Sequence, residues 1–454
     1  MMNQVEQERI HTYYQLLEQS DTLGIDIKPQ TNFKDAMIRY VLAPSLNGYI
    51  QWVLNQAKER QIKRLYFLSR DGYLMYQVAK CYCEKLALPI DCRYLYCSRY
   101  SIRIPTYYLD INEAIDYICR NGIAISRQSI LDRMGILEEN IDAILEILGW
   151  ERRNLLKEIQ RIDLGKIKKE LKNNQQFITY LAAYSRKQYE NMQAYFRQEG
   201  LYEEVLYAIV DSGWTGTTQR TFSKILEASY RKTKLVGFYW GLYEVPNDMD
   251  SNLYSTYYFA PYKEIHKKAR FSNCLFESMY SAPHGMTMAY QCNEQGKYVP
   301  CLDAVRITQK EYMEHIEILI IEYTNCLLQQ CKNSCFYNID QDKKIIETMM
   351  SRFMSKPIKQ EVEAFGTILF CDDILDCAKQ KIACDLTRQE IKHNRIQYKI
   401  LNKFGYGQIH ICESAWIEGS IVRNGIGVQY DLWQQYMYKC LLYMKQAIVR
   451  GIKK

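Results

Sequence analysis

Two short segments carry side chains suited to phosphate chemistry, and the first follows the apolar run 65–68. It consists of Ser69, Arg70, Asp71 and Gly72. An arginine can bind a phosphate through two parallel hydrogen bonds, and carboxylate oxygens are ligands that Mg²⁺ accepts. We therefore expect Arg70 to meet an anionic group and Asp71 to hold a metal ion or a water molecule. The alternative is a structural turn in which the arginine and the aspartate pair only with each other.

The second segment reads Asp-Ser-Gly-Trp-Thr-Gly-Thr-Thr and follows the apolar run 205–210. Its glycines permit positive φ and a close approach of backbone to ligand. Its hydroxyls, and the start of the helix that follows, suit an anion. Asp211 could bind a sugar hydroxyl or, through water, Mg²⁺. The alternative is a strand-to-helix turn whose threonines only cap the helix. The candidate ligands here are Asp211, Ser212, Gly213, Thr215, Gly216, Thr217 and Thr218.

Four further polar side chains are weaker candidates. Arg99 and Arg103 follow the apolar run 92–97, and a turn-forming segment further along the chain holds Glu277 and His284. We expect Arg99, Glu277 and His284 to contribute to substrate binding. The alternative is that the arginines are solvated loop residues and that His284 is a bystander.

The elements around these segments predict an α/β fold. A strand at 65–68, a helix at 73–86 and a strand at 92–97 form a βαβ unit, which requires a parallel sheet with a right-handed crossover. A second strand–helix–strand series follows at 205–243. Because the carboxyl ends of parallel strands share one sheet edge, we expect both polar segments to lie together, where open α/β sheets bind ligands.

The rest of the chain has a helical pattern. In the segment 33–57, Pro44 and Gly48 are expected to break the helix in two, and a final helix is expected at 431–449. We predict a Rossmann-like core with a helical insertion and a helical carboxyl-terminal region. The expected units are 1–110 with the first βαβ, 111–200 as the insertion, 201–300 with the phosphate loop, and 301–454.

Composition excludes several classes of protein. The 454 residues are 48% hydrophobic and 24% charged, as in folded soluble proteins. The net charge of +7 is spread along the chain, so we expect no nucleic-acid partner. The 16 cysteines include no Cys-x-x-Cys pair, and there is neither a signal peptide nor an apolar run of the roughly 18–20 residues that a membrane span needs. We expect a cytoplasmic protein without a membrane span and without zinc.

The two polar segments together resemble the phosphate and pyrophosphate loops of type I phosphoribosyltransferases. In that family a Thr-Gly-Thr loop after an acidic strand end wraps a sugar 5′-phosphate, and an earlier loop meets the pyrophosphate. The resemblance implies that residues 215–218 hold the phosphate and that Asp211 holds the ribose hydroxyls. It places Arg70, Asp71 and Gly72 at the pyrophosphate with Mg²⁺. This sequence departs from the family in having Ser212 for the second acid and the bulky Trp214 in the loop.

A broader resemblance covers residues 47–72, 210–217 and 277–285. These segments are similar to a bacterial family labelled as predicted hydrolases of the haloacid dehalogenase (HAD) superfamily, often encoded among surface-polysaccharide and glycosyltransferase genes. That superfamily needs an aspartate nucleophile at the position where this chain has Ser69. The pair at 372–373 lacks the Gly-Thr that should follow it. A phosphatase with an aspartyl-phosphate intermediate is therefore disfavoured.

The sequence leads to three functional hypotheses. The first is a Mg²⁺-dependent transferase that acts on a phosphorylated or pyrophosphorylated sugar in bacterial surface-polysaccharide synthesis. In it Arg70, Asp71 and Asp211 perform the chemistry, and the metal is held by Asp71 and Asp211. The second is a non-catalytic sensor or scaffold that binds a sugar phosphate or nucleotide and docks a glycosyltransferase. The third is a HAD-like phosphohydrolase.

Overall fold

A five-stranded, all-parallel sheet forms the centre of the protein. The computed structural model describes residues 2–25, 32–120, 125–136, 140–159, 161–229, 234–331, 336, 338–370, 380–403 and 411–451. The strand order is β2-β1-β3-β4-β5. The predicted α/β class and Rossmann-like parallel sheet are confirmed. The strands are β1 (Arg64–Leu68), β2 (Asp91–Leu95), β3 (Tyr207–Trp214), β4 (Val236–Leu242) and β5 (Tyr254–Phe259).

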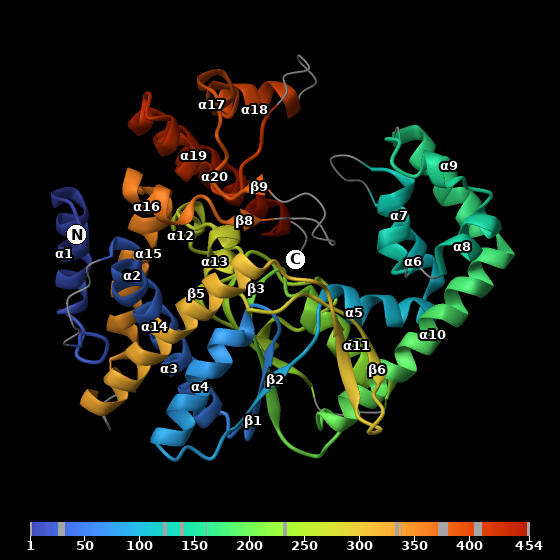
Figure 1. Cartoon of the computed structure of the whole chain (residues 1–454), viewed down its shortest axis with the longest axis horizontal. Coiled ribbons are helices and arrows are strands. Elements are labelled where there is room, and N and C mark those ends of the chain that lie inside the picture. Colours follow the sequence, from blue (N-terminus) through green and yellow to red (C-terminus); the bar gives the residue numbers. More distant parts are fainter. Residues whose placement is uncertain are drawn as a thin grey trace.

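Helices cover both faces of this sheet (Figure 1). The helices that come before β3 are α1 (Gln4–Leu17), α2 (Phe33–Met37), the π-helix η1 (Ile38–Leu42), α3 (Ala43–Glu59), α4 (Gly72–Lys85), α5 (Arg99–Arg103), the 3-10 helix η2 (Ile104–Leu109), α6 (Ile111–Ile118), α7 (Arg127–Met134), α8 (Ile141–Leu148), η4 (Arg152–Asn154), α9 (Arg161–Asn173) and α10 (Gln175–Gln198). Those after β3 are α11 (Thr217–Ala228), η5 (Ser251–Leu253), α12 (Ile265–Ala269), α13 (Asn273–Tyr280), α14 (Ile307–Cys331), α15 (Ile339–Ser355), α16 (Lys359–Phe365), α17 (Arg388–His393), α18 (Ile396–Lys403), α19 (Ile417–Asn424) and α20 (Val428–Gly451).

Strand β1 is apolar from Leu65 to Leu68 because both of its faces are buried. In β1, Leu65 and Phe67 point into one core with α3 and α4, whereas Tyr66 and Leu68 point into the other. Side chains of a strand alternate between its faces, so a strand covered on both sides needs a continuous apolar run. On the second face Phe196 of α10 stacks on Phe222 of α11 with ring centroids 5.4 Å apart. The buried sheet thus holds the ends of β1 and β3 side by side.

A third core lies within the helices between β2 and β3. The helices α6 to α9 gather at one end of the long helix α10 (Figure 1). Their buried side chains, among them Ile115, Ile130, Ile144 and Phe177, form a cluster separate from the two sheet cores. Among the described residues of this region, the β-type pairing is confined to one bridge between Ser126 and Glu158. A helical unit therefore projects from the sheet on α5 and α10.

Several sequence expectations need correction. Strand β3 continues to Trp214, so Asp211 and Ser212 belong to the strand and not to a loop. Its extension pairs Gly213 and Trp214 with β4. Gly48 lies buried inside the continuous α3 and does not break it, and the irregular turn is the π-helix that precedes Pro44.

Two short antiparallel pairs were not predicted. The hairpin of β6 (Thr287–Cys292) and β7 (Tyr298–Leu302) lies in a segment without an expected strand, and β8 (Leu369–Phe370) pairs with β9 (Gln380–Lys381). The expected carboxyl-terminal helix is present as α20. The pair at 372–373, which bears on the phosphatase hypothesis, lies outside the described part of the chain. Among the helices described, none has a stretch long and apolar enough to traverse a bilayer.

Candidate functional site

The two polar segments meet in one cleft at the carboxyl ends of β1 and β3. These strands are neighbours in the sheet, but the chain leaves β1 toward β2 on one side and returns to β3 on the other. This reversal is a topological switch point, the usual ligand site of an open α/β sheet. The cleft has a volume of about 590 Å³. The predicted site residues that line it are Ser69, Arg70, Asp71, Arg99, Asp211, Ser212, Gly213, Thr215, Thr218 and Glu277.

Four other predicted residues do not line this cleft. Gly72 begins α4, where an added Cβ would lie 3.0 Å from the backbone of Phe67, so its small size serves the turn. Gly216 and Thr217 lie at the start of α11, outside the lining. His284 lies in a separate aromatic cluster, where its Nε2 accepts a hydrogen bond from the hydroxyl of Tyr94 at 2.8 Å. Its Nδ1 donates to the carbonyl of Gly285 at 2.8 Å.

The turn after β1 is fixed by Ser69 and joined to β3 through Asp71. The Oγ atom of Ser69 donates to the carbonyl of Cys97 at 2.7 Å and accepts from the Cys97 N–H at 3.1 Å. Both bonds commit the hydroxyl to holding the end of β1 against the segment after β2. The carboxylate of Asp71 accepts a hydrogen bond from the hydroxyl of Ser212. The first segment and the second are therefore in direct contact.

The glycines of the second segment allow close packing within the protein. Gly213 has φ +111°, and a Cβ there would lie 2.5 Å from the carbonyl oxygen of Gly241 in β4. Gly216 has φ +63°, and its Cβ would lie 2.7 Å from the ring of Tyr254. The expected positive φ angles are present, but the close neighbours are a strand and a tyrosine ring.

The threonines lie at the start of α11. The N-cap residue of this helix is Gly216, so no side-chain oxygen caps the helix from that position. Thr215 and Thr218 face the cleft, and the Oγ1 atoms of Thr215 and Thr217 are 3.2 Å apart. A helix start carries unpaired N–H groups and a partial positive charge, which suit an anion bound near Thr215 and Thr218.

Two arginines supply further positive charge. Ser98 accepts the N–H of Ser101 at 2.9 Å and caps α5, which makes Arg99 the first residue of that helix. Both Arg70 and Arg99 line the cleft, and no ion pair between described residues involves either guanidinium. Arg103 instead stacks on the ring of Tyr117 at 4.1 Å and lies outside the cleft lining. Arg70 and Arg99 are thus two cations of the cleft that are available to an anion.

Three of the carboxyl groups that line the cleft, Asp71, Asp211 and Glu277, have a raised pKa. Burial, and then the charge of Asp71, raises the pKa of Asp211 to about 7. The same two causes raise the pKa of Glu277 to about 8. Burial also raises the pKa of Asp71, although the Ser212 hydrogen bond and the charges of Arg70 and Arg99 oppose this. Near neutral pH the cleft therefore holds groups that can give and take protons.

Trp214 orients Glu277. Its indole Nε1 donates a hydrogen bond to Oε1 of Glu277, which projects from α13. The ring itself is buried and packs against Phe271 and Phe276, with centroids 5.5 and 5.8 Å away. Trp214 therefore positions Glu277. It is also the bulky residue that distinguishes this segment from the phosphoribosyltransferase pattern.

The donor set fits a magnesium ion held by two carboxylates. Within the described residues, no group of three or more His, Cys, Asp or Glu side chains is placed to hold a metal. Mg²⁺ commonly uses one or two carboxylates, with water and substrate phosphate completing its shell. Asp71 and Asp211 are close enough for the charge of one to raise the pKa of the other. A cation between them would relieve that repulsion.

Sequence reasoning missed the contributions of distant segments to this cleft. Residues Leu442, Tyr443 and Gln446 of α20 line it, as do Arg120 and Asn273. Tyr443 stacks on Tyr243 with centroids 5.3 Å apart, which attaches α20 to the end of β4. None of these residues lies in a motif, so the sequence carried no signal for them.

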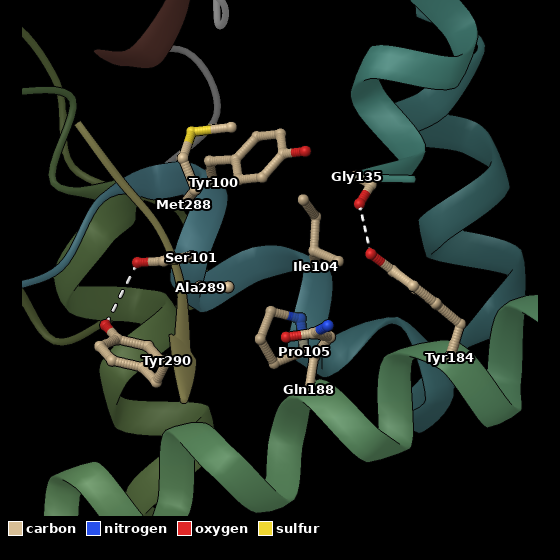
Figure 2. Close-up of a pocket in the computed structure, with 10 residues that line it drawn as sticks. All are labelled: Tyr100, Ser101, Ile104, Pro105, Gly135, Tyr184, Gln188, Met288, Ala289 and Tyr290. Atoms are coloured by element: carbon tan, nitrogen blue, oxygen red, sulfur yellow. Dashed lines mark hydrogen bonds between the residues drawn. The ribbon is translucent and has the colours of Figure 1, made fainter. Parts of the chain in front are cut away.

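A second, enclosed cavity lies where the helical unit meets the core (Figure 2). Its volume is about 10 Å³, room for roughly one water molecule. Figure 2 shows Tyr184 of α10 donating to the carbonyl of Gly135, at 2.7 Å, and Ser101 beside the hydroxyl of Tyr290, at 3.2 Å. These bonds join the unit to the core, and the cavity is too small for a substrate.

Comparison with known proteins adds no assignment. No protein-family model matches this chain, and no curated protein is significantly similar to it. The function proposed below therefore rests on the cleft itself and on the motif resemblances.

Proposed function

We propose that the cleft binds a phosphorylated sugar or nucleotide with Mg²⁺ and transfers its glycosyl group. The observation that carries this proposal is the contact between the two segments: Ser212 bonds to Asp71 within one cleft that also holds Arg70 and Arg99. Cations, hydroxyls and a helix start surround a pair of carboxyls at a switch point. This combination suits a phosphate-bearing ligand and a metal better than an apolar or neutral one.

The cationic side of the cleft would bind the anionic groups. Arg70 and Arg99 are free of ion pairs among the described residues and can each bind phosphate oxygens in two-pronged fashion. Thr215 and Thr218 offer hydroxyls beside the start of α11. A ligand with two phosphate groups could therefore be held at the arginines and at the helix start together.

During transfer the carboxyl groups would hold the metal ion and donate a hydrogen bond to the leaving group. Asp71 and Asp211 would hold Mg²⁺, which would supply positive charge against the leaving pyrophosphate. The bond from the anomeric carbon to the pyrophosphate oxygen breaks and its electron pair leaves with the oxygen, while an acceptor forms the new bond. The protonated Glu277 can donate a hydrogen bond to the leaving group, and the acceptor's proton is released to water.

The HAD-like phosphohydrolase is less well supported. Ser69 occupies the position of the nucleophile, and its hydroxyl is engaged with both the N–H and the carbonyl of Cys97. A non-catalytic scaffold that docks a glycosyltransferase remains the main rival, because it would need the same binding groups. We further propose, on the motif resemblance, a role in bacterial surface-polysaccharide synthesis and a location in the cytoplasm, which agrees with the many free thiols.

A turnover assay separates these functions. The purified protein is incubated with phosphoribosyl pyrophosphate or nucleotide sugars, with and without Mg²⁺, and released pyrophosphate or nucleotide is measured together with inorganic phosphate. Mg²⁺-dependent release that is lost in Asp211→Asn supports the transferase. Binding without release supports the scaffold, and phosphate release from aryl phosphates that is lost in Asp71→Asn supports the hydrolase.

A further inference from the structure

A basic groove between α12 and α15 is separate from the cleft. It has a volume of about 380 Å³ and shares no lining residue with the cleft at β1 and β3. Its charged lining consists of His266, Lys267, Arg270, Glu347, Arg352 and Lys356. Four side chains that are permanently cationic at neutral pH thus surround a single carboxylate.

The one carboxylate of the groove is already neutralised. Oε1 of Glu347 is 2.6 Å from Nζ of Lys267. In the part of the chain that the structure describes, no ion pair involves Arg270, Arg352 or Lys356. A concave surface with three uncompensated cations attracts anions, because its walls exclude part of the screening solvent.

The cationic side chains are attached to well-held elements. The guanidinium of Arg270 lies over the ring of Tyr436 in α20 at 5.0 Å, and Nδ1 of His266 is 2.7 Å from the hydroxyl of Tyr436. Nη2 of Arg9 donates to the carbonyls of Arg352 and Lys356 at 3.2 and 3.1 Å. The backbone that carries the cations is therefore positioned before any ligand binds, which lowers the entropic cost of binding.

Two lysines on the elements that form the groove have lowered pKa values. Burial, and then the charge of Lys267, lowers the pKa of Lys343. Lys268 is buried beside the groove, and burial lowers its pKa to about 8.

We propose that this groove is a second binding site, for a ligand carrying a phosphate or diphosphate group. Arginine and lysine together with the hydroxyl of Ser351 are a donor set suited to phosphate oxygens, and the volume admits a diphosphate with a small substituent. Free phosphate compounds and phospholipid headgroups share this chemistry. The site does not depend on the function proposed for the cleft.

Calorimetric titration of the full chain with inorganic pyrophosphate, without Mg²⁺, tests the site. Arg270→Ala/Lys356→Ala removes two exposed cations and is expected to weaken the groove site by about tenfold or more. Arg70→Ala removes a cation from the cleft and should leave the groove unchanged. Wild-type protein should therefore show a binding event that persists in Arg70→Ala and is lost in the double variant.

The matched control is Lys166→Ala/Lys169→Ala. These lysines line another open groove, of about 480 Å³, but Lys166 pairs with Asp163 at 2.8 Å and Glu170 lies in the same lining. The control should bind pyrophosphate like wild type. A single Arg352→Gln variant, which keeps a hydrogen-bonding side chain of similar length, should show a smaller loss and guards against misfolding of the double variant.

A second experiment distinguishes a phospholipid headgroup from a soluble phosphate compound as the ligand of the groove. Vesicles of phosphatidylglycerol and phosphatidylcholine in equal amounts are compared with pure phosphatidylcholine vesicles in a co-sedimentation assay. Binding to the anionic vesicles alone, lost in Arg270→Ala/Lys356→Ala, assigns the site to a headgroup, and binding to free pyrophosphate assigns it to a soluble ligand. The proposal is overturned if the double variant matches wild type in both experiments, or if the lysine control loses as much binding.

Discussion

The hydroxyl of Ser212 donates a hydrogen bond to the carboxylate of Asp71, which links the residues that follow β1 to the end of β3. The two residues are 141 positions apart in the sequence, with the whole helical unit between them. Their contact converts two separate polar segments into one site. It also opposes the effect of burial on Asp71, because it stabilises the charged form.

Ser212→Ala is expected to weaken Mg²⁺-dependent ligand binding while leaving the fold intact. A hydrogen bond to a charged group contributes about 1.5–3 kcal/mol, and without it the pKa of Asp71 rises, so protons compete better with the metal. Calorimetric titration of ligand at fixed Mg²⁺ measures the change. Thr221→Ala is the control, since that hydroxyl only donates to the carbonyl of Thr217 within α11, at 3.1 Å. Equal losses in the two variants would contradict the role of Ser212.

Stability without Mg²⁺ is expected to fall as pH rises from about 5 to about 8. The pKa of Asp211 is raised to about 7 and that of Glu277 to about 8, while both groups ionise near pH 4 in the unfolded chain. The folded state therefore holds protons that the unfolded state has released, and stability is lost as pH passes through the raised values. Each pH unit between the unfolded and the raised pKa costs about 1.4 kcal/mol per group, so the expected loss is on the order of several kcal/mol.

Chemical denaturation at several pH values measures how steeply the free energy of unfolding falls with pH; we call this the pH slope. In the Asp211→Asn/Glu277→Gln variant the pH slope should largely disappear, since neither side chain titrates. Mg²⁺ should recover more stability at pH 8 than at pH 5, because the metal needs ionised carboxylates. If the free energy of unfolding depends on pH in the same way in wild type and in the variant, Asp211 and Glu277 are not the carboxyl groups whose pKa values are raised.

Trp214→Phe is expected to raise the pKa of Glu277 further while retaining most of the ring packing. The indole N–H bonds to Glu277, and a hydrogen bond to the ionised form lowers its pKa. Infrared difference spectra of the protonated carboxyl band, compared with Glu277→Gln, give the titration. Trp240→Phe is a matched control, because Nε1 of this buried tryptophan has no hydrogen-bond partner within the described structure. An unchanged Glu277 titration in Trp214→Phe would contradict the orienting role.

Gly213→Ala is expected to destabilise the protein more than Gly296→Ala does. Both glycines have positive φ, +111° and +74°, which costs a non-glycine residue about 1–3 kcal/mol. A Cβ at Gly213 would also lie 2.5 Å from the carbonyl oxygen of Gly241, whereas nothing lies within 4 Å of one at Gly296. Thermal denaturation of the two variants isolates the clash with β4. Similar losses would show that β3 can shift away from β4 at low cost.

The local part of the fold could be read from the sequence because its signals are short-range. Apolar runs bounded by polar turns predicted β1 and β2 within a few residues of their bounds, and the connection between them required a parallel sheet. The extension of β3 to Trp214 could not be predicted in this way. Residues 211–214 have the composition of a turn, and only pairing with β4 holds them in the sheet.

The part of the site that directly follows the predicted strands could also be predicted from the sequence. Arg70, Asp71 and Asp211 follow strands directly, so a parallel sheet brings them together without any knowledge of the rest. Thr217 and His284 were expected in the site but do not line it. The contribution of Tyr443 depends on how α20 packs about two hundred residues away, against Tyr243, and no local pattern encodes it.

The central claim is that the cleft binds a phosphorylated ligand through Mg²⁺ and Asp211. A thermal-shift panel tests it most directly, comparing wild type and Asp211→Asn, with and without Mg²⁺, against phosphoribosyl pyrophosphate, nucleotide sugars, sugar phosphates and inorganic phosphate. A ligand at about 100 times its dissociation constant stabilises the folded state by about 2.7 kcal/mol. We predict a Mg²⁺-dependent shift with one phosphorylated sugar or nucleotide that is lost in Asp211→Asn. No shift with any ligand, or the same shift in the variant, would contradict the account.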